Sequence, residues 1–145
     1  MIVRILAIIL TGLALVAPMA HLYELPRKIG LSKERYFVVQ EIYQGWVLAG
    51  FLLPLALITD LALAFASRDG ARLLAAIAAG LIAINLIIFM IWTQPVNRVT
   101  NNWTVQTENW QALRQQWEYS HAVNAGVTLA AFIAITIAAL KSAGD

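Results

Sequence analysis

Apolar residues fall in four long runs along the chain, separated by polar segments. The runs cover residues 2–20, 42–66, 73–92 and 122–140, and all are rich in Ala, Leu and Ile. A helix needs roughly 20 mostly apolar residues to cross the hydrocarbon core of a bilayer, and each run has about this length. The pattern therefore predicts an all-α protein, a four-helix transmembrane bundle in a single integral membrane domain over residues 1–145.

The polar segments between the runs alternate in length. Residues 67–70 form a short turn, so the second and third helices should pack as an antiparallel hairpin. The other two connections, residues 21–41 and 95–121, are long and polar, and an arrangement of four spans places both on the same membrane face. We expect them to form a polar headpiece on the face opposite both termini.

Helix signals in the first headpiece segment continue into the second span. Pro26 and Gly30 should end the first helix, because both residues interrupt helical hydrogen bonding. Ser32 then has the character of an N-cap, and Glu34 lies in the first turn, where the helix dipole favours a carboxylate. No strong breaker follows before the second span. We therefore expect helix two to extend into the headpiece.

Three tryptophans in the second headpiece segment, Trp103, Trp110 and Trp117, are spaced seven residues apart. Pro95 should stop the third helix, and the spacing would place the three rings on one stripe of the next helix. No breaker separates them from the last apolar run. The pattern predicts one long helix over residues 101–140, with the tryptophans at the membrane interface or in the core of the headpiece.

Composition agrees with a membrane protein and excludes several function classes. Hydrophobic residues make up 61% of the chain and charged residues 12%, and a soluble chain of this size could not bury so much apolar surface. Without cysteine there is no disulfide, thiolate metal site or cysteine nucleophile. No basic cluster indicates nucleic-acid binding. The bilayer is the expected partner, with four basic residues contacting lipid headgroups: Arg27, Lys28, Lys33 and Arg35.

The first span and the basic residues bear on topology. Residues 5–20 resemble a signal peptide, but Pro18 fits poorly at a small-residue cleavage site, so a retained first span is expected. Basic residues on the termini face lie close to the spans; they are Arg4, Arg68, Arg72 and Lys141. This charge density favours a multi-pass protein of the cell membrane with both termini in the cytoplasm.

Two polar residues lie within the predicted spans. A carboxylate is costly in lipid, so we expect Asp60 at the membrane boundary, paired with Arg68 or Arg72. Asn85 is expected to form a hydrogen bond between two helices.

Both histidines lie on the headpiece side, and each has a glutamate three residues away. The pairs are His21 with Glu24 and His121 with Glu118, so each pair shares a helix face. The histidines end span one and begin span four at a similar depth. Since packed helices lie about 10 Å apart, we expect both rings to face one site within that distance of each other.

Three interpretations of these pairs are open. They could be structural contacts, with Arg114 bridging Glu118 at an interval of four residues. One histidine could instead be a general acid or base, because its reference pKa suits proton transfer near neutral pH. As the alternative to these, His21, Glu24, Glu118 and His121 could bind a metal or haem, as paired Glu and His residues do in helical bundles.

One segment of the chain is similar to a known family. Pro95-Val96-Asn97, followed by Trp110, Arg114, Trp117 and His121 before a final apolar run, resembles the anthrone-oxygenase-like family of small four-span membrane proteins. The resemblance is strongest over residues 95–125. It implies oxidation of an apolar aromatic molecule that enters from the membrane, by oxygen and without a metal or flavin cofactor.

The function favoured by these observations is an oxidoreductase-like membrane protein that acts on an apolar aromatic small molecule. His121 would be the acid or base, and Glu118 and Arg114 would orient it. The substrate site would be shaped by aromatic and polar side chains, namely His21, Asn97, Trp110 and Trp117. The rival prediction is a non-enzymatic accessory subunit or a metal- or haem-binding protein. The sequence leaves open whether the chain binds copies of itself or a partner subunit in the membrane.

Overall fold

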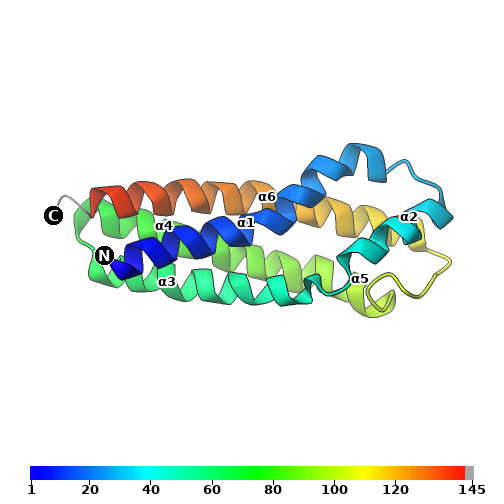
Figure 1. Ribbon diagram of the computed structural model, residues 1–145, viewed down its shortest axis with the longest axis horizontal. Helices are drawn as coiled ribbons and strands as arrows, with labels where there is room; N and C mark the ends of the chain where they lie inside the picture. Colours follow the sequence, from blue (N-terminus) through cyan, green and yellow to red (C-terminus); the bar gives the residue numbers. More distant parts are fainter. Residues whose placement is uncertain (143–145) are drawn as a thin grey trace.

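The computed structural model describes residues 1–142, the side chain of Val47 excepted, and no strand occurs in that range. Four long helices run side by side along the molecule, and shorter elements lie at one end (Figure 1). In chain order the elements are α1 (Ile2–Lys28), α2 (Lys33–Gln40), the 3-10 segments η1 (Glu41–Tyr43) and η2 (Trp46–Phe51), α3 (Leu52–Ala66), α4 (Asp69–Ile88), the π-helical segment η3 (Phe89–Thr93), α5 (Gln94–Val99) and α6 (Trp110–Lys141).

The predicted all-α membrane bundle is confirmed by the length and composition of the long helices. Helical stretches over Ile2–Lys28, Leu48–Ala66, Asp69–Val99 and Trp110–Lys141 are each long and apolar enough to cross a membrane. Large apolar side chains cover the outer surface of these stretches, and Phe65, for example, is 83% exposed. Water would not tolerate so large an apolar surface, whereas lipid does. The chain is therefore a membrane protein that contacts the bilayer.

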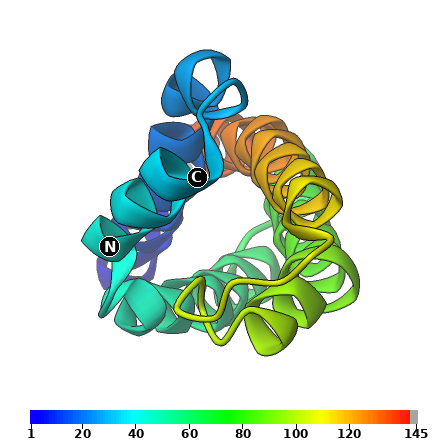
Figure 2. The ribbon, with the colours of Figure 1, turned by 90° about the vertical axis from the view of Figure 1, so that its right-hand side faces the viewer.

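Small residues fill the interior between the four helices. α6 packs against α1 and α4, and α3 packs against the same two helices, which closes the ring of helices in Figure 2. Alanines such as Ala7, Ala78 and Ala138 are fully buried between them. A Cβ added at Gly12 would lie 3.2 Å from the Phe132 ring, so the glycine lets α1 and α6 approach closely.

The two ends of the bundle differ in structure. Arg4 Nη1 donates a hydrogen bond of 2.7 Å to the carbonyl oxygen of Ser142, so the start of α1 and the end of α6 meet at one end of the bundle, which we call the termini end. α2, α5 and residues 100–109 gather at the opposite end, which we call the distal end (Figure 1). The short turn between α3 and α4 lies at the termini end, as the predicted hairpin requires.

Residues 100–109 form a turn, so the prediction of one helix over residues 101–140 is wrong at its start. Asn101, Asn102 and Trp103 have φ angles of 45°, 55° and 64°, and these left-handed residues reverse the chain. The Thr100 hydroxyl accepts a hydrogen bond of 3.0 Å from the Trp103 N–H. This local bond and the tolerance of Asn for the left-handed region compete successfully with helix formation. α6 begins at Trp110, and Trp103 therefore does not share its stripe.

Helix two is interrupted before it reaches the distal end. Ser32 caps α2 by accepting a hydrogen bond from the Arg35 N–H, and Glu34 lies in the first turn, as predicted. α2 ends at Gln40, however, and Gly45 has a φ of 91° between η1 and η2. The predicted continuous extension of helix two is wrong, because a left-handed residue ends the ladder of helical hydrogen bonds.

Neither Pro26 nor Pro95 ends its helix. α1 continues through Pro26 to Lys28, and the Ile29 N–H still donates to the Leu25 carbonyl at 3.0 Å. The third long helix continues through η3 into α5, where Pro95 lies in the first turn. A proline needs no N–H partner at that position, and the π-helical turn before it accommodates the shift in hydrogen bonding.

Neutral polar pairs join α6 to the third long helix. Asn85 of α4 donates a hydrogen bond to the Thr128 hydroxyl of α6, which confirms the predicted bond between helices. Nearer the distal end, the hydroxyls of Thr93 in η3 and Ser120 in α6 lie 2.8 Å apart. Each pair satisfies polar atoms that lipid could not.

Asp60 pairs with neither Arg68 nor Arg72 in residues 1–142, so the predicted pairing is wrong. Its side chain is fully buried on the face of α3 that packs against α1. There the carboxyl oxygens accept from the Thr11 hydroxyl at 3.1 and 3.2 Å. Arg68 and Arg72 lie beyond the turn that follows α3, and neither forms an ion pair with Asp60 within residues 1–142.

Candidate functional site

His21 and His121 lie together at the distal end of the bundle. Their ring centroids are 4.2 Å apart and the ring planes are inclined by 36°. His21 is 4% exposed, whereas His121 is half-buried. The expectation that the two rings lie within about 10 Å of each other is confirmed.

Seven-residue spacing explains why the two rings meet. Side chains seven residues apart lie on the same face of a helix, and helices that pack along such faces bring them together. The stripe of α1 that faces the interior contains Ala7, Ala14, His21 and Lys28. The corresponding stripe of α6 contains Arg114, His121, Thr128 and Ile135. Each histidine thus continues a stripe that, nearer the termini end, consists of small or apolar residues and one threonine.

Aromatic rings surround the two histidines. The Trp117 ring lies 4.3 Å from His121 and 4.7 Å from His21, edge-on to both. The Tyr43 ring lies 4.5 Å from His21, and the Trp46 ring lies 6.0 Å from it. η1 and η2 bring these two rings in, since each lies on one side of the left-handed Gly45. The imidazoles therefore sit in an environment of flat aromatic surfaces.

Lys28 lies seven residues after His21 on the same face of α1 and brings a buried positive charge to the site. It is only 3% exposed, and its Nζ lies 3.0 Å from Glu118 Oε1 and 3.4 Å from Glu24 Oε2. The same ammonium donates to the Tyr43 hydroxyl at 3.1 Å and lies 4.4 Å from the centre of the Tyr43 ring. Two carboxylates and an aromatic face compensate for the water that Lys28 has lost.

Glu118 connects Lys28 to α2. It is fully buried, and its Oε1 accepts a hydrogen bond of 2.9 Å from the Tyr36 hydroxyl. Gln40 Nε2 in turn donates to the Tyr36 oxygen. Burial and the nearby Glu118 carboxylate raise the pKa of Tyr36 above its ordinary value, so the phenol remains a donor. A hydrogen-bonded chain therefore runs from Lys28 through Glu118 and Tyr36 to Gln40.

Three further predicted site residues lie in a second layer around Trp117. Asn97 Oδ1 accepts a hydrogen bond of 2.8 Å from the Trp117 indole N–H, which fixes the orientation of that ring. Arg114 donates to the Leu31 carbonyl at 2.8 Å and lies 4.6 Å from the centre of the Trp110 ring. None of these three residues contacts a histidine ring through an interaction that the structure records in residues 1–142.

The predicted orientation of His121 by Glu118 and Arg114 is wrong. Glu118 faces Lys28 and Tyr36, and Arg114 forms no ion pair with it among the described residues. Residues four apart on a helix can pair, but a partner on another helix offers a better-buried contact here. Trp117 is the residue on α6 that contacts His121.

The alternative metal site requires both histidines and both glutamates to converge on one ion. Glu24 and Glu118 bind Lys28 instead, and no group of three or more His, Asp or Glu side chains in residues 1–142 is placed to hold a metal. The contact between the rings of His21 and His121 also leaves no space for a haem between them. The geometry does not fit the metal or haem interpretation.

Four buried polar atoms of the site have no hydrogen-bond partner in residues 1–142. They are Nδ1 of His21, Oε1 of Gln40, Nε of Arg114 and Oε2 of Glu118. Buried polar atoms are nearly always paired, and the exceptions are often functional. The Nδ1 nitrogen of His21 is one of these exceptions within the described residues.

Sequence reasoning missed four residues of this site: Lys28, Tyr36, Gln40 and Tyr43. Lys28 was assigned to lipid headgroups because it lies near the end of an apolar run. Its spacing of seven residues from His21 was the available signal. The other three lie on α2 and η1, whose approach to α6 depends on the break at Gly45.

No protein-family model, no curated protein and no solved structure matches this chain. Its function is therefore argued from these residues and their contacts.

Proposed function

We propose that this protein is an oxidoreductase-like membrane enzyme that removes a proton from an apolar aromatic small molecule. The observation that supports this most directly is the contact of His21 with His121 inside a cluster of aromatic rings. Neither ring forms an ion pair within residues 1–142. A buried imidazole without a counter-ion favours the neutral form, which is the form that accepts a proton.

His121 is the base in this proposal. It is half-buried and can meet a ligand from the membrane, whereas His21 is buried behind it. The His21 ring packs against His121, with centroids 4.2 Å apart, and supports the orientation of the base. Trp117, held by Asn97, offers a flat face on which an aromatic substrate can pack.

The reaction that fits this base is oxidation of an activated ring methylene by molecular oxygen. His121 takes one proton from the CH₂ group and leaves a carbanion. The carbanion gives its electron pair to O₂ and forms a C–O bond, and the resulting peroxide anion takes the proton back from the histidine to become a hydroperoxide. The second C–H bond and the O–O bond of the hydroperoxide then break, which releases water and leaves a carbonyl group. Overall, CH₂ and O₂ give C=O and H₂O, and the balance needs no further oxidant.

Anthrone is a suitable probe for this activity, with anthraquinone formation and oxygen uptake measured on the purified protein in detergent. His121→Asn should lower the catalysed rate by about 10²–10⁴-fold, the usual contribution of a general base. Tyr119→Phe is the matched control, since Tyr119 is an exposed neighbour on the outer face of α6. Equal rates in wild type, His121→Asn and protein-free detergent would disprove the proposal.

The topology that we propose for this enzyme has the termini in the cytoplasm of a cell-membrane protein and the distal end outside the lipid as a polar headpiece. It rests on the basic residues close to the spans at the termini end. The chain has no cysteine, so single cysteines can report sidedness. Arg68→Cys should react with an impermeant thiol reagent only from the cytoplasmic side, and Gln111→Cys only from the opposite side. The reverse pattern would overturn the orientation.

A further inference from the structure

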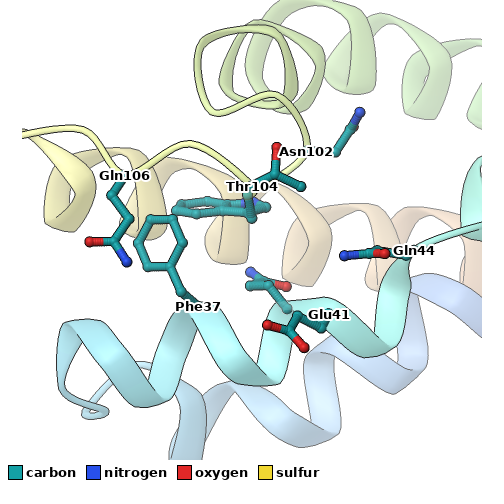
Figure 3. Close-up of a pocket in the computed structure, with 8 residues that line it drawn as sticks. Phe37, Glu41, Gln44, Asn102, Thr104 and Gln106 are labelled. Atoms are coloured by element: carbon teal, nitrogen blue, oxygen red, sulfur yellow. The ribbon is translucent and has the colours of Figure 1, made fainter.

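The open surfaces at the two ends of the bundle differ in charge. At the distal end, a cavity of about 220 Å³ lies between α2 with its following residues and the turn at residues 100–109 (Figure 3). Its lining is neutral apart from the Glu41 carboxylate, and Figure 3 shows amides such as Gln44 and Asn102 around it. The termini end is basic instead, with four cationic side chains: Arg4, Arg68, Arg72 and Lys141.

Contacts between α1, α4 and α6 bring these cations to one place. Arg4 of α1 donates to the carbonyl oxygen of Ser142 at 2.7 Å, so its guanidinium lies beside the end of α6. Lys141, the last residue of α6, has its Nζ 3.7 Å from the position that a Cβ would take on Gly70. Gly70 lies in the first turn of α4, within the segment that carries both other arginines. The four cations therefore surround the start of α4.

No acidic side chain in residues 1–142 neutralises this basic group. Both ion pairs of the described chain belong to Lys28 at the distal end. Asp69 lies in the first turn of α4 but forms no ion pair with a neighbouring cation in that range. Arg72 Nε donates to the Ser67 carbonyl at 2.9 Å, which holds the guanidinium in place without cancelling its charge. The termini end therefore attracts an anion.

Exposed apolar side chains continue from the basic group along the same helices. Ile2 of α1, Leu73 of α4 and Leu140 of α6 are 70%, 63% and 68% exposed. Each lies within two residues of one of the four cations. A soluble phosphate would meet only the cations, whereas a lipid places an anionic headgroup on the cations and acyl chains on the apolar side chains. The arrangement therefore fits a lipid better than a soluble anion.

We propose that the basic group around the start of α4 binds the headgroup of an anionic phospholipid. The phosphate oxygens would accept hydrogen bonds from Arg68 and Arg72 of α4 and from Lys141 of α6. The acyl chains would lie against the exposed apolar side chains next to them. A lipid bound in this way links the turn between α3 and α4 to the end of α6, and this role is independent of the chemistry at the histidines.

Native mass spectrometry of the full-length protein in detergent tests the proposal, with phosphatidylglycerol and phosphatidylcholine of identical acyl chains as probes. Wild type should bind phosphatidylglycerol at least about tenfold more tightly, because phosphatidylcholine has no net charge. Equal affinity for the two lipids would overturn the proposal, since acyl chains alone would then account for binding. Binding of glycerol 3-phosphate as tightly as phosphatidylglycerol would also overturn it, because the site would then recognise a soluble phosphate.

Substitutions that each remove one positive charge locate the site. Arg68→Gln and Lys141→Gln should each weaken phosphatidylglycerol binding about fivefold, the contribution of one cation near an anionic surface. Both side chains are exposed, so neither substitution disturbs the core. Arg35→Gln and Arg98→Gln are matched controls, because each removes an exposed cation at the distal end, and they should change the affinity by less than about twofold. Equal losses in all four variants would show a response to net charge alone and would overturn the site.

Discussion

Two buried carboxyl groups, Glu118 near the distal end and Asp60 nearer the termini end, have opposite surroundings. Both side chains are fully buried. Glu118 has the Lys28 ammonium at 3.0 Å and the Tyr36 hydroxyl at 2.9 Å. Asp60 has only the Thr11 hydroxyl, and no lysine or arginine within 4.0 Å in residues 1–142. The surroundings of Glu118 therefore favour the ionised carboxylate, and those of Asp60 favour the protonated acid.

The difference follows from the free energy of burying charge. An isolated carboxylate is so unfavourable in an apolar interior that the group takes up a proton instead, whereas a carboxylate with a cation and a donor can remain ionised. We therefore expect an ionised Glu118 and a protonated Asp60. The distal end holds its charges in one compact network, and the termini end holds a neutral acid between α1 and α3.

The largest expected effect is the loss of the cation that Glu118 depends on. Lys28→Met should destabilise the folded protein by about 3–5 kcal/mol, because it leaves a buried carboxylate with one phenol donor. Unfolding in mixed micelles, followed by circular dichroism, measures this. The double variant Lys28→Met with Glu118→Gln should be more stable than Lys28→Met alone. Strictly additive losses would mean that the two residues are not coupled.

The Asp60 carboxyl provides the contrasting case. Asp60→Asn should change the free energy of unfolding by less than about 1 kcal/mol, because a neutral amide replaces a neutral acid. Asp60→Ala should lower it by about 1–3 kcal/mol, because Thr11 loses its partner and a void remains. A hydrophobic carbodiimide, which reacts with protonated carboxyls, should label Asp60 and spare Glu118 in the native protein. Labelling of Glu118 in preference to Asp60 would reverse the comparison.

Hydropathy predicted the four spans because crossing a bilayer depends on the composition of one segment at a time. The convergence of His21 and His121 was also predictable, since four spans fix which helix ends share a face. Lys28 was not identified, because near a membrane boundary a lysine has two plausible partners, lipid phosphate and a buried carboxylate. Only the position of Glu118 on α6 decides between them.

The distal end was predicted less well, because its fold depends on left-handed residues. Gly45 ends the helical path after α2, and Asn101 and Asn102 do the same before α6. Both asparagine and glycine also occur within helices, so a pattern of apolar spacing does not reveal their φ angles. The arrangement of the aromatic cluster depends on these two breaks. The spacing of the tryptophans predicted rings at the membrane interface or in the headpiece core, but it did not predict which rings they contact.

The Tyr36 phenol tests the charge of Glu118 from outside the spanning helices. Its pKa is raised in the folded state by burial and by Glu118, so above about pH 10 the unfolded chain ionises first. The free energy of unfolding should then fall as pH rises, by up to about 1.4 kcal/mol per pH unit for this one group. Below about pH 10, Tyr36 should contribute no pH dependence to the free energy of unfolding. Comparison of wild type with Tyr36→Phe from pH 8 to 11 isolates the contribution. Identical pH slopes would show that Tyr36 titrates normally.

The smallest expected effect belongs to the neutral pair Asn85 and Thr128, which carries no charge in either partner. The amide donates to the hydroxyl between α4 and α6, and both residues are buried. Hydrogen bonds between membrane helices contribute about 0.6 kcal/mol on average, because the unfolded helices also find partners in the membrane. A double-mutant cycle with Asn85→Leu and Thr128→Val should therefore give a coupling free energy near that value. This is far below the coupling expected for Lys28 with Glu118. A coupling above about 2 kcal/mol would exceed the range for neutral pairs, and the contrast between charged and neutral polar contacts in this bundle would then fail.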